Sequence, residues 1–388
     1  MFVTPLFKLM ADKQASDLFF TAGAPIQIKI NGVLMPINNQ VLDPEQVKKI
    51  CFELMSEVQV KEFESTSEMN FAHRDRVAQG NFRINIFRQR NTVAMVIRYV
   101  KPEVPPIDSL MLPPILKELI MQKLGLILVV GATGSGKSTT MAAMIDYRNT
   151  VQTGHILTLE DPIEFLFKHK KSIVNQREVG MDTRSYEHGL ISAMREAPDL
   201  LMIGEIRDRE TLQTVLLFSQ TGHLCLSTLH ANNSYNALSR VIGFFPRETR
   251  DAFLADLSNA LRAVISQRLV RNKDGKRVPA VEVLLNTKHV SELIRAGEIE
   301  QIKEAMEQSL APGSQSFEQA LFDLYSNETL TLDEAMANAD SPTNLHWLIN
   351  NAPKTSGSRT PAAQPGAAKP TQPSDDLSSI KLNLDSLG

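Results

Sequence analysis

Hydrophobic and polar residues alternate along much of the first hundred residues, which is typical of half-buried strands. Residues 27–34 alternate across an Asn-Gly pair, a strong signal for a tight hairpin. Residues 81–87 place one Phe and two Ile side chains on one face, and a partner strand is predicted over 93–98. Residues 44–63 carry apolar side chains at helical spacing, which predicts a helix. This region is therefore expected to be a small α+β domain.

Beyond about residue 107 the pattern changes to short apolar runs that alternate with helical stretches. The runs are 126–130, 155–159, 200–203 and 224–228. Continuous apolar runs are typical of strands buried on both faces, so they predict an α/β domain with a largely parallel sheet covered by helices. Apolar residues also recur at 3.6-residue spacing between 253 and 269, which predicts a late helix. They are Phe253, Leu254, Leu257, Leu261, Val264, Ile265 and Leu269.

Proline marks two further segments. Residues 101–106 contain three prolines and predict a stiff linker. Residues 353–376 contain five prolines and no Leu, Ile, Val or aromatic residue, so they are expected to be a flexible tether. Apolar residues return over 377–387, either as a docking peptide or as a frayed tail. The expected organisation is a domain over 1–100, a linker over 101–117, a second domain over 118–350 and a tail over 351–388.

Charge and composition exclude several classes of protein. Forty-one Lys and Arg residues against 44 Asp and Glu leave a formal charge of −3, which is too balanced for general attraction to a polyanion, although a local basic patch is still possible. Two cysteines cannot make a disulfide framework or a four-thiolate zinc site, which fits a reducing compartment. No run of about 18 apolar residues occurs and the start lacks the features of a signal peptide. A cytoplasmic chain without a transmembrane segment is expected.

The most specific motif lies between the strand predicted over 126–130 and a helix predicted to begin near Lys137. It fits the pattern G-x-x-x-x-G-K-[ST]. Glycines let backbone N–H groups point at phosphate oxygens, Lys137 can neutralise the β- and γ-phosphates, and Ser138 can ligate Mg²⁺. The sequence therefore predicts a nucleoside triphosphate site. Its residues are Gly131, Ala132, Thr133, Gly134, Ser135, Gly136, Lys137, Ser138 and Thr139.

Hydrolysis also needs acidic residues at neighbouring strand ends, where they order water and metal. Glu160 follows the strand predicted over 155–159, and Glu205 follows the strand over 200–203 with Gly204 between. The second stretch resembles a Walker B element in which Gly204 stands where an Asp would hold Mg²⁺. Glu205 is therefore the expected water-polarising base, and Glu160 is expected to share that role or to hold metal. An exposed salt bridge is the simpler alternative for either residue.

Histidines and arginines are the remaining candidates. His223 and His230 bracket the strand over 224–228; both can be structural, or they can sense the γ-phosphate and relay its loss. Arg83, Arg88 and Arg98 lie on the paired strands of the first domain. Each alone is more often a solvated strand residue, but together they could supply charge to a nucleotide across an interface.

With these residues in view, the sequence resembles the secretion-type ATPases, most closely the PilT/PilU branch that powers type IV pilus retraction. The resemblance covers about residues 3–350. Residues 158–164 are similar to the Asp box of the family, 194–208 to its Walker B signature and 221–230 to its His box. Residues 81–90 are similar to its arginine-bearing strand pair.

The resemblance implies a RecA-like P-loop ATPase domain after a smaller PAS-like domain. It also implies ATP as the nucleotide, with Mg²⁺, and a homohexameric ring in which arginines close over each nucleotide. A PilT-type ATPase and an inner-membrane platform protein of the pilus are the implied partners, and the implied location is the cytoplasmic face of the inner membrane at the pilus base.

Three departures from the family pattern occur. Ala197 stands where the common signature has Asp, the helix expected over 289–298 lacks the usual start, and the Pro-rich tail extends past the usual end. The altered helix and the tail favour the PilU type, an accessory motor. A nucleotide-gated coupling subunit with little turnover is the alternative. A pilus-assembly ATPase would have a tetracysteine insertion, but this chain has two cysteines. A nucleic-acid translocase would have a basic, aromatic-rich surface, but aromatic residues are 6% of this chain.

Overall fold

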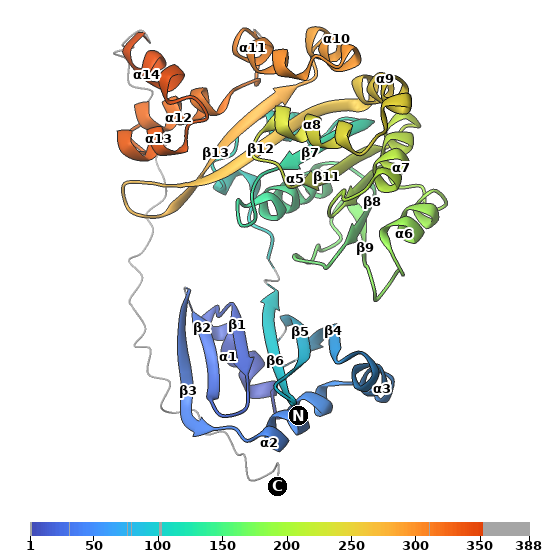
Figure 1. Cartoon of the computed structure of the whole chain (residues 1–388), viewed down its shortest axis with the longest axis vertical. Coiled ribbons are helices and arrows are strands. Elements are labelled where there is room, and N and C mark those ends of the chain that lie inside the picture. Colours follow the sequence, from blue (N-terminus) through green and yellow to red (C-terminus); the bar gives the residue numbers. More distant parts are fainter. Residues whose placement is uncertain are drawn as a thin grey trace. The chain divides into compact units, whose positions relative to one another are not determined.

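The computed structural model describes residues 2–351 except 31, 76, 79, 101–102 and 310. Contacts divide these residues into two units, which lie within Met1–Pro102 and Glu103–Thr355 (Figure 1). Within the segment 101–117, expected to be a linker, Ile107 and Leu116 are buried in a core of the second unit. The tether and the docking peptide expected beyond residue 351 lie outside the described residues.

Within the described residues, the first unit is a six-stranded sheet in the order β3-β2-β1-β6-β5-β4, and all neighbouring strands are antiparallel. Both predicted hairpins are confirmed, because Ile30 of β2 pairs with Val33 of β3, and β5 pairs with β6 along its length. The elements are α1 (Thr4–Lys13), β1 (Asp17–Phe20), β2 (Pro25–Ile30), β3 (Val33–Val41), α2 (Pro44–Leu54), α3 (Glu57–Thr66), β4 (Glu68–Asp75), β5 (Gly80–Gln89) and β6 (Thr92–Val100).

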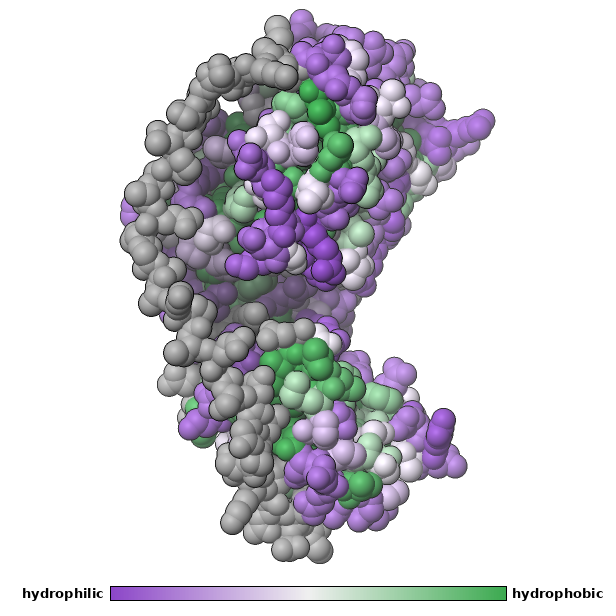
Figure 2. Space-filling view, turned by 90° about the vertical axis from the view of Figure 1, so that its left-hand side faces the viewer, coloured by the Kyte–Doolittle hydropathy of each residue, from purple (hydrophilic) through white to green (hydrophobic). Residues whose placement is uncertain are grey.

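The edge strand β3 is an open border of this sheet. It carries no charged residue, and Val33 and Leu34 are 59% and 54% exposed. Hydrophobic surface is visible on this unit in Figure 2. Edge strands are often protected from pairing with other chains by charged residues or by proline, and β3 carries Pro36.

The single helix predicted over 44–63 is wrong. The chain leaves helix α2 at Met55, whose backbone is extended, and starts α3 after Ser56. The Ser56 hydroxyl accepts a hydrogen bond from the Gln59 N–H at 3.3 Å, and the Ser56 N–H donates to the Gln59 side chain at 2.9 Å. This reciprocal capping box satisfies backbone groups at a new helix start, which outweighs a continuous apolar spacing.

The second unit has, within its described residues, a seven-stranded sheet in the order β13-β12-β7-β11-β10-β8-β9. All neighbouring strands are parallel except β12 and β13. The predicted α/β class with a largely parallel sheet after a smaller α+β domain is therefore confirmed. The strands are β7 (Gly125–Val130), β8 (Gly154–Glu160), β9 (Ser172–Glu178), β10 (Leu200–Ile203), β11 (Leu224–Leu229), β12 (Leu261–Arg271) and β13 (Arg277–Leu285).

Helices cover both faces of this sheet (Figure 1). Alternate residues of β7 belong to different cores: Leu126 and Leu128 pack in one, and Ile127 and Val129 in the other. This is why the strand reads as a continuous apolar run. The helices are α4 (Ile115–Ile120), α5 (Lys137–Val151), α6 (Tyr186–Ala193), α7 (Arg209–Gln220), α8 (Ser234–Gly243), α9 (Arg250–Ala260), α10 (Lys288–Ala296), α11 (Ile302–Glu307), α12 (Phe317–Ser326), α13 (Leu332–Asn338) and α14 (Pro342–Asn351), with short 3₁₀ turns at Ile107–Ser109, Arg247–Thr249 and Ile299–Gln301.

The late helix predicted through residue 269 is also wrong in its second half. Helix α9 ends at Ala260, and the chain continues directly as strand β12, which pairs in parallel with β7. Val264 packs in the core on one face of the sheet and Ile265 in the core on the other. A strand that is apolar on both faces satisfies helical spacing by accident, and the β-branched side chains were the signal for a strand.

Candidate nucleotide-binding site

The glycine-rich loop connects β7 to α5, and its backbone conformation depends on glycine. Gly131 has φ +152° and Gly136 has φ +90°. A Cβ atom on Gly131 would lie 2.4 Å from the Ser135 Oγ and 2.5 Å from the Gln267 carbonyl oxygen. Neither distance is sterically possible, so no side chain can replace that hydrogen without moving β12. The loop therefore lies tightly against the sheet at the N-terminus of a fifteen-residue helix.

Lys137, the first residue of α5, is buried and folds back over the loop. Its Nζ donates hydrogen bonds to the carbonyl oxygens of Gly131 at 2.8 Å and Ala132 at 2.9 Å. Burial lowers the pKa of Lys137, and the carboxylates of Glu205 and Glu164 oppose that shift. The ammonium group thus lies at the mouth of the loop with acceptors that phosphate oxygens can replace.

Gln267 of β12 holds the loop from behind. Its Nε2 donates to the Ser135 carbonyl oxygen at 2.9 Å, and its Oε1 accepts from the Thr140 hydroxyl at 2.6 Å. Ser135 itself is 6% exposed, and its Oγ has no hydrogen-bond partner among the described residues. A buried polar atom without a partner and a ring of backbone N–H groups at a helix start both fit a phosphate ligand. Sequence reasoning missed Gln267 because no local motif contains it.

A cavity of about 450 Å³ opens beside this loop. It is lined by Lys137 and Ser138 from the loop side and by Glu160, Glu205 and His230 from the opposite side. Glu160 is the last residue of β8, and Glu205 and His230 follow β10 and β11; these three strands are neighbours in the parallel sheet. The structure thus brings these five predicted residues together with Thr133, Gly134, Gly136 and Thr139 of the predicted loop.

Glu160 is buried and fully engaged by its own surroundings. Its Oε1 accepts from the Thr158 hydroxyl at 2.6 Å and from Gln176 Nε2 at 3.1 Å, while its Oε2 accepts from the Glu164 N–H at 3.4 Å. Burial raises the pKa of Glu160, and these three hydrogen bonds oppose the rise. The carboxyl group therefore joins β8 to β9 and to the segment that follows β8.

Glu205 is held between two nitrogen-bearing side chains. Arg207 Nε donates to its Oε2 at 2.8 Å, and His230 Nε2 lies 3.3 Å from its Oε1. Arg207 Nη1 also approaches Asp161 Oδ2 at 3.5 Å. The hydrogen bond to Glu205 raises the pKa of Arg207. Sequence reasoning missed Arg207, although it stands only two residues after Glu205 in the Walker B-like stretch.

The structure separates the two histidines. His230 lies at the cavity, but His223 precedes the six-residue strand β11 and so lies at the opposite edge of the sheet. Its Nδ1 is 3.2 Å from the Phe218 carbonyl oxygen, and the two rings meet edge to face at 5.2 Å. Within a single chain, His223 is not brought to the nucleotide site.

The three arginines predicted to close over the nucleotide belong to the first unit. Arg98 Nε donates to Asp17 Oδ1 at 2.8 Å, and the Arg88 guanidinium lies 5.4 Å from the centre of the Phe63 ring. Arg83 pairs with Arg98 across β5 and β6. Their contribution to the nucleotide stays a prediction.

Magnesium binding also stays a prediction. No group of three His, Cys, Asp or Glu residues that could hold a metal ion occurs among the described residues. Ser138 and Glu160, the predicted metal ligands, both line the cavity. In the described part of the chain, no helix has the length and apolar character needed to cross a membrane.

Tyr186 is a cavity residue that the sequence analysis did not single out. It is the first residue of α6 and lines the cavity beside Glu160 and Glu205. A Cβ atom on Gly204 would lie 2.8 Å from its Oη. The signal was present as an unexplained glycine in a Walker B-like stretch, but only the folded chain shows what occupies the space.

Comparisons with known proteins agree with this geometry. The family model described as "Type II/IV secretion system protein" matches residues 1–307. The type IV pilus ATPase PilU of Pseudomonas aeruginosa is 48% identical over 345 residues, which are 89% of this chain and 90% of that protein. The type IV pilus retraction ATPase PilT of the same organism is 37% identical over 89% of this chain and 100% of its own length. A crystal structure of the pilus retraction motor PilT with bound ADP matches with a TM-score of 0.83 and 40% identity, over 89% of this chain and 99% of that chain.

Proposed function

The chain belongs to the family of type II/IV secretion system proteins, and we propose that it hydrolyses ATP in a hexameric ring to drive or assist retraction of a type IV pilus. Within the family it is an ATPase of the PilU/PilT kind. The observation that carries the proposal is the single cavity in which Lys137, Glu160, Glu205 and His230 converge on the glycine-rich loop. The similarity to an ADP-bound motor supports a nucleotide as the occupant.

In this proposal the loop residues bind and orient the phosphates. Lys137 exchanges its bonds to the loop carbonyls for bonds to the β- and γ-phosphates, which leaves its charge paired throughout. Backbone N–H groups at the start of α5 point at the same oxygens. Magnesium would supply charge neutralisation between the two phosphates, and the Ser138 hydroxyl is the group that would hold it.

Glu205 fits the role of water-polarising base better than Glu160. Glu205 follows β10 at the cavity, and the Arg207 guanidinium donates to one of its oxygens and so orients the carboxylate. The other oxygen lies against His230, which fits a group that responds to the loss of the γ-phosphate. Glu160 is buried and accepts three hydrogen bonds from the strands and the segment around it, so we assign it the role of holding the segment around the cavity.

The assembly and its partners come to this chain from its family. We propose a homohexamer that works with a PilT-type ATPase on the cytoplasmic side of the inner membrane, against the platform protein of the pilus. Arg83, Arg88 and Arg98 are the groups we propose to supply charge to the nucleotide when a ring forms. No nucleic acid is proposed as a partner, because neither the charge balance nor the aromatic content favours it.

Steady-state ATPase assays on the full chain test the proposal, with and without a PilT-type partner. Glu205→Gln is expected to retain ATP binding and to lose at least about a hundredfold in turnover, whereas Lys137→Ala is expected to lose binding. Glu292→Gln, an exposed carboxylate on α10, is the matched control and should match the wild type. Near-normal turnover by Glu205→Gln would transfer the base role to Glu160.

The assays with the PilT-type partner distinguish an autonomous motor enzyme from a coupling subunit, the two functions that the sequence left open. Turnover by the wild type alone would establish an autonomous motor enzyme. Turnover near background that rises only with the partner would support the coupling subunit. An absence of nucleotide binding by the wild type would contradict both.

A further inference from the structure

We propose that Tyr186 is a phosphate-binding residue of this site, whose hydroxyl donates a hydrogen bond to the terminal phosphate of ATP. The hydroxyl occupies the space that an acidic side chain at position 204 would need. The residue would distinguish ATP from ADP through that hydrogen bond. This inference rests on the proposed function, since it needs a nucleoside triphosphate in the cavity.

The ring of Tyr186 is anchored, and its hydroxyl lies beside Gly204, another residue that lines the cavity. Tyr186 begins α6 directly after the N-cap residue Ser185, whose hydroxyl accepts from the His188 N–H at 3.2 Å. The ring packs against the main core of the second unit, yet the residue also lines the cavity with Lys137 and Ser138. A side chain fixed at both its backbone and its ring presents its hydroxyl in one direction without a large loss of conformational entropy on binding.

The Tyr186 hydroxyl is free to bind a ligand. It has no hydrogen-bond partner among the described residues, although it lies among charged groups. Burial, together with the charge of Asp161, raises the pKa of Tyr186, while Arg207 opposes the rise. The phenol therefore stays protonated and acts as a donor. A donor without a partner at the edge of a cavity needs an acceptor, and phosphate oxygens are strong acceptors.

Gly204 shows that the chain makes room for this hydroxyl. Its φ does not lie in the left-handed region, so the backbone there does not require glycine. The restriction is space: an added Cβ would lie 2.8 Å from Tyr186 Oη, but 3.4 Å from the Leu159 carbonyl oxygen and 3.5 Å from Glu160 Cα, which are ordinary contacts. The tyrosine hydroxyl is thus the one close obstacle to a side chain at position 204. A side chain at position 204 would therefore have to displace the Tyr186 hydroxyl.

Tyr186→Phe is the test, because it removes only the hydroxyl. A hydrogen bond to a charged group corresponds to a loss of about tenfold or more in affinity. We expect ATP to bind about tenfold more weakly, ADP affinity to stay within about twofold and turnover to fall, measured with the full chain by calorimetry and steady-state kinetics. Tyr325→Phe, the same change at a tyrosine packed beside the core of α12–α14, should leave both affinities unchanged.

Two outcomes would overturn the inference. An unchanged ratio of ATP to ADP affinity in Tyr186→Phe would remove the terminal phosphate as its acceptor. An equal loss of both affinities would make the hydroxyl part of the loop scaffold instead. The proposed function fails separately, if the wild type binds neither nucleotide.

A double-mutant cycle with Gly204→Ala checks the spatial argument. Alone, Gly204→Ala should displace the hydroxyl and lose about as much ATP affinity as Tyr186→Phe. In the Tyr186→Phe background it should cost less than about twofold, because the atom that it would meet is gone. Additive losses in the two backgrounds would contradict the proposed displacement of the hydroxyl by a side chain at position 204.

Discussion

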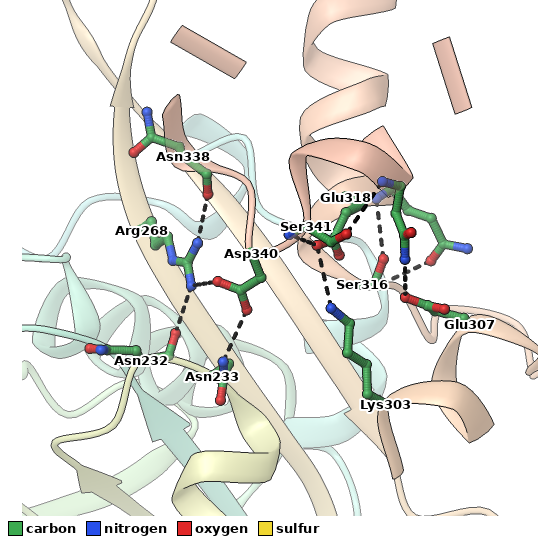
Figure 3. Close-up of polar contacts among 12 residues, drawn as sticks. Asn232, Asn233, Arg268, Lys303, Glu307, Ser316, Glu318, Asn338, Asp340 and Ser341 are labelled. Atoms are coloured by element: carbon green, nitrogen blue, oxygen red, sulfur yellow. Dashed lines mark hydrogen bonds and ion pairs between the residues drawn. The ribbon is translucent and has the colours of Figure 1, made fainter. Parts of the chain in front are cut away.

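Replacing Asp340 by Ala is expected to loosen the C-terminal helices from the sheet while leaving the sheet itself intact. Asp340 lies between α13 and α14 and forms an ion pair with Arg268 of β12 (Figure 3). Its second carboxylate oxygen accepts from Asn233 Nδ2 at 3.0 Å. Because Asn233 caps the N-terminus of α8, one carboxylate joins three elements that are distant in sequence.

Arg268 keeps other partners when Asp340 is removed. Its Nη1 donates to the Asn338 carbonyl oxygen at 2.6 Å and its Nη2 to the Asn232 carbonyl oxygen at 3.2 Å. Its guanidinium also stacks 4.0 Å from the centre of the Phe317 ring. The cation is therefore not orphaned in the variant, which limits the cost to the bonds that Asp340 itself makes.

The magnitude follows from those bonds. Both side chains of the ion pair are mostly buried, with 23% and 15% exposure, so solvent screens them little. Both bonds end on the Asp340 carboxylate, and a hydrogen bond to a charged group contributes at least about 1.5 kcal/mol. The expected loss is about 3 kcal/mol, which increases local opening roughly a hundredfold. Asp340→Asn keeps one polar bond and should lose about half as much.

Hydrogen exchange resolves where that loss appears. The helices α12–α14 pack with Val270 of β12 and Val278 of β13 in a core separate from the two cores that contain β7, so faster exchange is expected over residues 332–351 and unchanged exchange over β7. Asp333→Ala, an exposed acidic residue of α13, should change stability by less than about 1 kcal/mol. Unchanged exchange over 332–351 in Asp340→Ala would refute the anchoring role, and uniformly faster exchange would place these bonds in the main core.

Three further changes have expected outcomes. Ala197 is exposed with φ +47°, so Ala197→Gly should raise the free energy of unfolding by about 1 kcal/mol in urea titrations; no gain would mean that the loop relaxes. Burial raises the pKa of Glu282, so the native state binds more protons than the unfolded state, and stability falls as pH rises above the ordinary carboxyl pKa. Glu282→Gln should flatten this pH dependence in urea titrations between about pH 4 and 8. An unchanged pH dependence would contradict the role of Glu282. Gly131→Ala must displace the Gln267 carbonyl and should weaken ATP binding at least about tenfold by calorimetry; normal binding would mean that β12 yields easily.

Several residues of the site could be predicted from the sequence because their chemistry is contained in short segments. The glycine-rich loop is recognisable because its spacing and its place between an apolar run and a helix are all contained in one short segment. Glu160 and Glu205 were predicted because residues at the carboxyl ends of neighbouring parallel strands meet at one edge of a sheet. His223 and His230 were predicted because they bracket one strand and resemble a family motif, and only His230 lies at the cavity.

Other features depend on partners that the sequence does not name. The segment after Ala260 has apolar residues that suit a helix or a buried strand, and its pairing with β7 decided for the strand. Gln267 reaches the loop only because β12 lies beside it. Tyr186 enters the cavity from a helix that no motif marks, and it explains a glycine that looked like a missing ligand.

By itself, then, the sequence determined the phosphate loop, the class of fold and the strand ends that carry acidic residues, because each is encoded in a short segment with its own chemistry. Only the tertiary structure decided which side chains share the cavity, which helix ends early and what fills the space at Gly204. Those outcomes depend on contacts between residues far apart in the chain, and such contacts have no periodicity or spacing to reveal them.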